Sequence, residues 1–130
     1  MKIKNIYDKF PTNESCLILL EKIYWDNAPR CPYCKSKSQS PLPKERRYHC
    51  NSCKTTFRVT VNTIFHKSKI DLQKWFMLIW LYFNSPVEFT VRQIGEDLLV
   101  TKDTAWLMLK KIKMAEESEK EKLKSIINAF

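Results

Sequence analysis

The sequence predicts a small α+β protein in which a cysteine-rich ribbon of short antiparallel strands is joined to a helical bundle. Three observations indicate this fold class. Four cysteines form two C-x-x-C pairs within residues 31–53. Residues 71–84 are rich in tryptophan and place apolar side chains at helical spacing. Two further helical segments follow, with a short turn near residues 99–101 between them.

Composition excludes two broad classes of protein. The chain has 130 residues, of which 44% are hydrophobic and 12% aromatic, which is typical of globular proteins. Its longest apolar run, Trp75 to Phe83, is far shorter than the ~20 residues that span a bilayer. The short apolar stretch Cys16–Leu20 is flanked by acidic residues and lacks the pattern of a signal peptide. We therefore expect neither a membrane protein nor a secreted one, and we expect a cytoplasmic location.

The cysteine spacing predicts a metal site. The pairs are Cys31-Pro-Tyr-Cys34 and Cys50-Asn-Ser-Cys53, and each would form a tight knuckle that supplies two sulfurs to a tetrahedral zinc ion. A thioredoxin-like redox motif needs only one such pair. Redox or metal-free cysteines remain the alternative. We expect a four-cysteine zinc ribbon with one structural Zn²⁺, and expect Cys16 to be a small buried hydrophobe on a helix.

Basic charge is concentrated around these cysteines. The net charge of +9 lies within residues 1–70, since residues 71–130 hold equal numbers of acids and bases. Ten basic residues and one acid, Glu45, fall within residues 30–69. A solubilising surface usually carries both signs, so this stretch favours a polyanionic partner, with nucleic acid the natural candidate. The expected phosphate-binding residues are Arg46, Arg47, Lys54 and Arg58 on or beside the strands, and Lys35, Lys37 and Lys44 on the loops.

Local signals divide the chain into four segments. Residues 1–30 would be the N-terminal helix segment, whose helix is capped at Thr12 or Asn13. Residues 31–62 would form the zinc ribbon. Within the ribbon we expect a loop at 36–43 and strands at 46–50 and 55–61. Residues 63–114 would hold a hub helix and a helix-turn-helix, and residues 115–130 a charged, solvated helix or linker.

The hub helix opens at Asp71 and ends at residues 84–86. It is apolar on all sides, so we expect the other helices to pack around it. An aromatic box for a ligand is the alternative.

Two capped helices follow the hub helix. Thr90 would cap a helix over Val91–Leu98, and Thr101 one that begins at Lys102. The pattern is typical of a helix-turn-helix, whose second helix enters the major groove of DNA, although an ordinary helical hairpin shows it too. Trp106 would face either the DNA or the hub helix. The expected DNA-binding residues are Arg92, Thr101, Lys102, Asp103, Trp106, Lys110 and Lys111, with Lys113 placed for a phosphate.

Several segments match a known family in order and spacing. They are residues 10–16 (FPTNESC), Trp25 ahead of the first cysteine pair, residues 48–53 (YHCNSC), residues 63–76 and residues 102–108 (KDTAWLM). Over residues 10–114 the layout resembles the N-terminal region of insertion-sequence transposases, which carry a zinc ribbon, a helix-turn-helix and then a ribonuclease-H-like catalytic domain.

The chain departs from this family at five places. Such proteins often have glycine where this chain has Lys35, Lys54, Asn62 and Leu99, and a small residue such as alanine in place of Gly95. A left-handed backbone at Lys35, Lys54 or Leu99 would cost on the order of 1–2 kcal/mol each. A glycine at position 95 would weaken its helix by up to ~1 kcal/mol.

No catalytic residues are expected in this chain. The family's reaction needs carboxylates that converge on two metal ions, whereas the acids after Met114 are neighbours on one charged helix. A zinc ion held by four cysteines has no open position for substrate. His49 and His66 are isolated in the sequence.

The resemblance implies a zinc-dependent DNA-binding module of a transposase, without its catalytic domain, that recognises the terminal repeats of a mobile element. The expected partners are double-stranded DNA in the nucleoid and a full-length transposase or a second copy of the chain, with no membrane and no small-molecule substrate. A zinc-ribbon adaptor that binds proteins and a free-standing DNA-binding regulator are the alternatives.

Overall fold

The computed structural model describes residues 3–26, 28–42, 46–61, 63–66, 68–84 and 90–129. Lys44 and Asn62 lie outside these residues. The described chain forms two compact units, a helical unit from residues 1–13 and 70–130 and a ribbon unit from residues 14–69. In chain order the elements are α1 (Ile3–Lys9), α2 (Asn13–Trp25), β1 (Gln39–Leu42), β2 (Arg47–Cys50), β3 (Thr56–Phe57), α3 (Leu72–Asn84), α4 (Val91–Leu98) and α5 (Lys102–Asn128).

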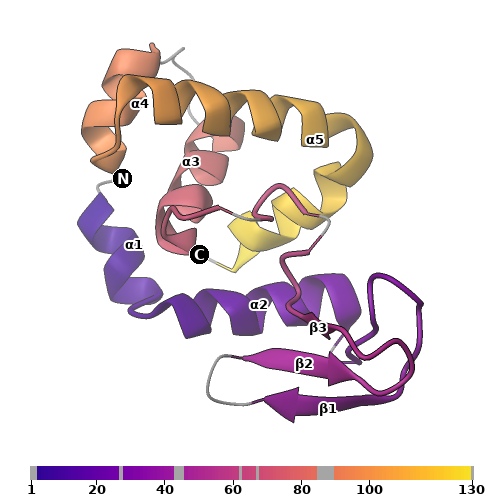
Figure 1. Ribbon diagram of the computed structural model, residues 1–130. Coiled ribbons are helices and arrows are strands. Elements are labelled where there is room, and N and C mark those ends of the chain that lie inside the picture. The colour runs from indigo at the N-terminus through magenta and orange to yellow at the C-terminus, as the bar shows by residue number, and fades with distance from the viewer. Residues whose placement is uncertain are drawn as a thin grey trace. The chain divides into compact units, whose positions relative to one another are not determined.

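Helix α3 is the hub of the helical unit, as predicted. It packs against α1, α4 and α5 (Figure 1). Its Trp75, Phe76 and Ile79 side chains are at most 1% exposed. The aromatic residues at these positions are therefore core, and they do not line a ligand box. Among the described residues, no helix is both long and apolar enough to cross a membrane.

Helix α1 was not predicted. Its seven residues carry too little periodicity to indicate a helix, and tertiary contacts with α3 stabilise it instead. Ile6 is buried, and the ring of Phe10, just beyond the helix, meets Phe76 edge to face with centroids 5.3 Å apart. The Gln73 side-chain amide donates to the Phe10 carbonyl at 3.0 Å.

Helices α4 and α5 begin at the residues that the sequence predicts. The Thr90 hydroxyl accepts from the Gln93 N–H at 3.2 Å, and the Thr101 hydroxyl accepts from the Thr104 N–H at 3.1 Å. Each hydroxyl thereby satisfies one of the unpaired donors of a first helical turn. Both predicted caps are confirmed.

The turn between α4 and α5 has a left-handed residue, Leu99, with φ 58°. The Val100 N–H donates to the Gly95 carbonyl at 2.9 Å, and the Leu99 N–H reaches the Glu96 carbonyl at 3.4 Å. This is a Schellman motif, which normally places glycine at the left-handed position. Helix propensity alone predicts that Gly95 weakens α4, but the structure shows a reason for glycine there: a Cβ at position 95 would lie 2.9 Å from the Val100 carbonyl oxygen.

The C-terminal part of the chain continues α5. We expected a solvated helix or linker there, but the helix is partly buried. Leu123 and Ile126 are fully buried. Glu119 interrupts the regular helix with φ −130° and ψ 23°. Such a break changes the direction of the helix, so residues on its two sides need not bury the same face.

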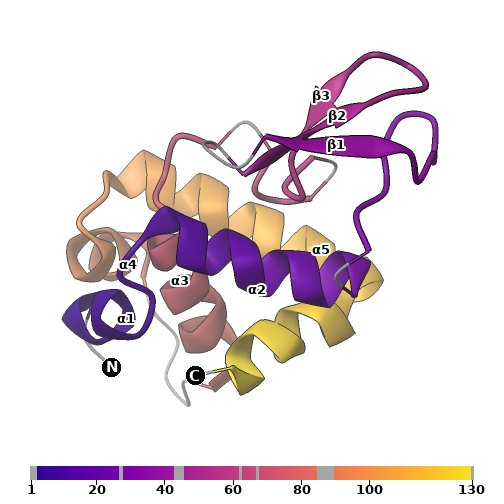
Figure 2. The ribbon, with the colours of Figure 1, turned by 90° about the horizontal axis from the view of Figure 1, so that it is seen from below.

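The ribbon unit contains α2 and a three-stranded antiparallel sheet in the order β1-β2-β3 (Figure 2). Gln39 pairs with Cys50, and Tyr48 pairs with Phe57. Two expectations were wrong. Residues 39–42 form an edge strand instead of a loop, with Pro41 paired to Tyr48. An edge strand tolerates proline because its outer side has no neighbouring strand that needs the missing N–H. Strand β3 is only two residues long, since a turn closed by the Val61 N–H and the Arg58 carbonyl follows it.

Three aromatic rings form the core of this unit. Trp25 lies edge to face against Tyr48 and Phe57, with centroids 5.5 and 5.8 Å away, and Tyr48 stacks on Phe57 at 5.8 Å. Cys31 and Cys50 are buried against the same cluster. Thus the small core supports one side of the cysteine site.

Candidate metal centre and basic surfaces

The two C-x-x-C pairs fold into the same turn. The Lys35 N–H donates to the Cys31 carbonyl and the Lys54 N–H to the Cys50 carbonyl, each at 3.0 Å. Both lysines have φ 63°, in the left-handed region. The Ser36 and Ser52 hydroxyls meet at 2.9 Å and link the two knuckles. This repeated geometry turns all four cysteine side chains toward one point.

The sulfur positions fit one tetrahedral metal ion. The Cys31–Cys53 and Cys34–Cys50 sulfur distances are 3.6 and 3.5 Å. All four sulfurs lie within 4.8 Å of one another. Zinc–sulfur bonds of about 2.3 Å place the sulfurs of a regular tetrahedron about 3.8 Å apart, whereas a disulfide would bring two of them to about 2 Å. The four cysteines are positioned to bind one metal ion, as expected.

Local hydrogen bonds favour the thiolate at two of the four ligands. The Cys53 N–H donates to the Cys50 sulfur at 3.4 Å and lowers the pKa of the Cys50 thiol. The Thr55 side chain lowers the pKa of Cys53 to about 6. For Cys34, the Ser36 N–H lowers the pKa, but the hydrogen bonds with the other three cysteines and the loss of solvent together outweigh it and raise the pKa to about 12. Thiolate is the form that binds metal.

A partly buried ion pair joins α2 to the residue that precedes β2. Glu21 is 5% exposed and accepts from Arg46 through Nε at 2.9 Å and Nη2 at 3.2 Å. The Tyr48 hydroxyl donates to the same carboxylate at 2.7 Å. Arg46 also lies 3.6 Å from Glu14. The sequence suggested that Arg46 binds phosphate, but its guanidinium is engaged within the fold.

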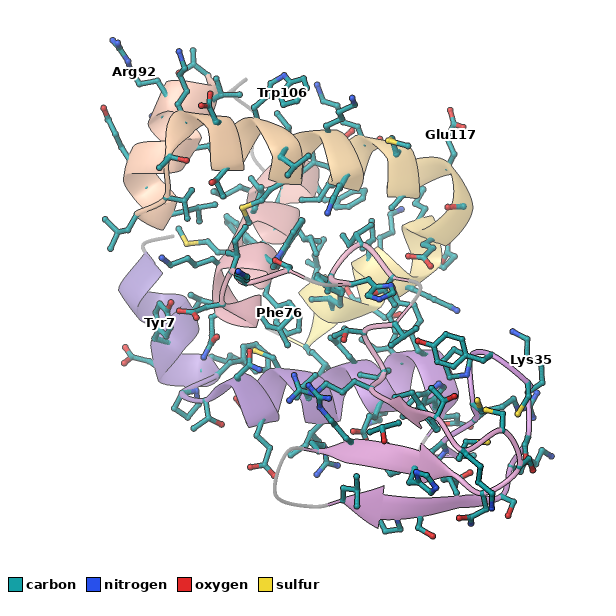
Figure 3. The ribbon with its side chains drawn as sticks, viewed as in Figure 1. Tyr7, Lys35, Phe76, Arg92, Trp106 and Glu117 are labelled. Atoms are coloured by element: carbon teal, nitrogen blue, oxygen red, sulfur yellow. The ribbon has the colours of Figure 1, made fainter. Side chains whose placement is uncertain are left out.

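The other basic residues of the ribbon differ in exposure. Arg58 is only half-exposed, and its Nε atom is buried. Arg47, on β2, is exposed. The exposed cations next to the knuckles are Arg30, Lys35, Lys37 and Lys54, which we call the knuckle rim. In Figure 3, Lys35 lies at the end of the ribbon where the sulfur atoms gather.

Helix α5 presents the outer face that its periodicity predicts. Ala105 and Met108 are fully buried, whereas Lys102, Asp103 and Lys110 are exposed. Arg92 is exposed on α4, Lys113 is exposed on α5 and Lys111 is half-buried, while the Thr101 side chain serves as the helix cap.

Trp106 does not pack on the hub helix. Its side chain is 54% exposed, and the Lys110 ammonium lies 5.1 Å from its ring centroid. Figure 3 shows Trp106 on the outer side of α5, while Phe76 points into the core of the helical unit. Two exposed apolar residues on the same helix, Leu107 and Met114, were not predicted, although a helical wheel anchored on Ala105 and Met108 would have placed them outside.

An open groove of about 730 Å³ lies along this face of the helical unit. Its lining is part apolar and part charged, and consists of Val91, Trp106, Leu109, Lys110, Lys113, Met114 and Glu117.

The architecture of the ribbon unit, two knuckles on a three-stranded sheet with four converging sulfurs, defines a zinc ribbon. Residues 11–56 match the family of transposase zinc-ribbon domains. This part of the chain is therefore similar to transposase zinc ribbons.

A second comparison agrees with this assignment. A protein of the transposable element ISH50 from Halobacterium salinarum is 31% identical over 91 residues, which are 68% of this chain and 30% of that protein. The chain thus spans about a third of the length of this relative. No solved structure matches the chain significantly.

Proposed function

We propose that the chain is the DNA-binding part of an insertion-sequence transposase and recognises the terminal repeats of a mobile element. The observation that supports this proposal most strongly is the positive charge around the metal centre. Residues 30–69 hold ten basic residues and one acid, and the knuckle rim is exposed. Four thiolates and one Zn²⁺ carry −2, so this stretch keeps a formal charge of about +7. A concentrated positive field of this kind favours the phosphates of nucleic acid.

In this proposal the ribbon supplies affinity and the α4–α5 pair supplies sequence preference. The two capped helices and their three-residue turn have the proportions of a helix-turn-helix. Lys102 and Asp103 stand exposed in the first turn of α5, where such motifs contact base edges. Lys can donate to guanine and Asp can accept from cytosine in the major groove. We propose no catalytic role for the chain itself; strand transfer belongs to a catalytic domain of a full-length transposase.

The test is retardation of a random-sequence duplex by the zinc-loaded chain at two salt concentrations. If the ribbon neutralises four to six phosphates, the logarithm of the binding constant falls with the logarithm of salt at a slope of roughly −4 to −5. Binding should therefore weaken by roughly 250-fold to 1,000-fold between 50 and 200 mM salt. Absence of retardation at low salt, or an affinity that ignores salt, would reject the proposal.

The groove along α5 favours a second candidate, a zinc-dependent protein adaptor. Trp106 and Met114 are 54% and 69% exposed, and apolar surface of this kind is typical of protein-binding sites. If the adaptor is correct, Trp106→Ala would abolish capture of a protein partner from the host, and the chain would not retard DNA.

A further inference from the structure

Two lysines of the metal centre have a backbone conformation that lysine rarely adopts. Lys35 and Lys54 both have φ 63°, in the region where a Cβ clashes with the backbone and glycine is the usual residue. Each occupies the same place in its knuckle, directly after the second cysteine, with its N–H bonded to the carbonyl of the first cysteine at 3.0 Å. The same strained choice therefore occurs twice in one site.

Within the part of the chain that the structure describes, neither lysine side chain has an intramolecular partner that would explain this choice. Both side chains are exposed, and among the described residues no ion pair involves either of them. By contrast Arg46, which also has a positive φ of 51°, is held by Glu21 and Glu14. Backbone strain that no contact within the fold offsets indicates that the side chain binds something outside the protein.

The site brings the two lysines to the same edge of the ribbon. Each follows a cysteine whose sulfur belongs to the cluster within 4.8 Å, and the Ser36 and Ser52 hydroxyls link the knuckles at 2.9 Å. Cys34 and Cys53 are the two exposed ligands, so this edge faces solvent. Since backbone conformation fixes where each Cα–Cβ bond points, the metal centre sets the direction in which both lysines leave the chain.

We propose that Lys35 and Lys54 form a paired phosphate clamp, and that the knuckle edge of the ribbon, more than its strand surface, faces the DNA backbone. The inference rests on the proposed function. On the strand side Arg46 is bound to Glu21 and Arg58 is half-buried, so that among the described residues Arg47 is the exposed cation there. At the knuckles four of the described cations are exposed, namely Arg30, Lys35, Lys37 and Lys54. Two lysines directed from one rigid centre would bind phosphates of one duplex with little loss of backbone freedom.

The test uses the full zinc-loaded chain, with glycine at both positions (Lys35→Gly/Lys54→Gly). Glycine relieves the left-handed strain, so the melting temperature should stay equal or rise, and zinc content should not change. Affinity for a random-sequence duplex at ~0.1 M salt should fall by about tenfold or more, and the salt slope should become shallower by about 2. Lys35→Arg/Lys54→Arg should keep both quantities near the wild-type values, because it keeps the charges.

Lys124→Ala is the matched control, because it removes an exposed lysine near the end of α5. It should leave the salt slope unchanged. The clamp is overturned if the double glycine variant binds DNA with wild-type affinity and slope. It is also overturned if that variant loses zinc together with DNA binding, since the lysines would then serve the metal centre. A wild-type chain that does not bind duplex DNA at all would instead reject the proposed function.

Discussion

Single residues with a left-handed backbone mark where this sequence accepts strain. Five described non-glycine residues have a positive φ: Asp26, Lys35, Arg46, Lys54 and Leu99. The cost that the family resemblance led us to expect at Lys35, Lys54 and Leu99 is therefore present in the fold. Leu99 differs from the lysines, because it is 72% exposed and carries no charge. At Leu99 the side chain therefore offers no charge that could offset the strain of the left-handed backbone.

Two substitutions in the turn between α4 and α5 should change stability in opposite directions. Leu99→Gly should raise the free energy of unfolding by about 1 kcal/mol, because glycine adopts the left-handed region without strain. Gly95→Ala should lower it by roughly 1–3 kcal/mol, because the new methyl group would lie 2.9 Å from the Val100 carbonyl oxygen and the turn would have to open. Chemical denaturation followed by circular dichroism measures both changes. A Gly95→Ala chain more stable than the wild type would show that helix propensity outweighs the close contact.

At the scale of elements, the helices and strands that depend on local sequence signals were predictable, and those that depend on tertiary contacts were not. The starts of α4 and α5 follow from Thr90 and Thr101, whose hydroxyls act within three residues of themselves. Strand β1 exists because residues 39–42 find a partner in β2, and α1 because it meets α3. Neither partner can be identified from the short segment itself. The cysteine site was predictable because the spacing of the ligands is itself a local signal. The ion pair that binds Arg46 to Glu21 was not, because the two residues are 25 positions apart in the chain.

Helix α5 carries the proposed sequence preference, and this can be tested apart from affinity. Lys102→Ala and Asp103→Ala should change which sequences are enriched in a selection from randomised duplexes, since each good base contact contributes about 1–3 kcal/mol of discrimination. Affinity for random DNA should stay within a few-fold. Lys124→Ala, on the same helix beyond the interruption at Glu119, should select the wild-type sequences. If the wild type and both test variants select one common site, α4 and α5 form a helical hairpin that does not read DNA.

At the scale of the whole molecule, each unit depends on a different source of stability. The helical unit has a conventional core around α3, with Trp75, Phe76, Ile79, Met108 and Ile112 at most 1% exposed. The described part of the ribbon unit has a cluster of three aromatic rings and a partly buried ion pair, which is a small core for the residues that it must order. In such domains metal binding supplies much of the folding free energy. The shape of the basic knuckle edge should therefore exist only in the zinc-bound chain.

The most direct test of this account is the affinity for a random-sequence duplex before and after zinc removal, measured by fluorescence anisotropy at one fixed salt concentration. Cys50→Ser supplies the same loss by mutation, and Cys16→Ala, which removes a buried sulfur outside the cluster, should keep zinc and DNA binding. We expect one zinc per wild-type chain, and a loss of most DNA affinity in the zinc-free and Cys50→Ser proteins. Equal affinity of the zinc-loaded and zinc-free chains would contradict the account, because the metal-held ribbon would then not be what binds DNA.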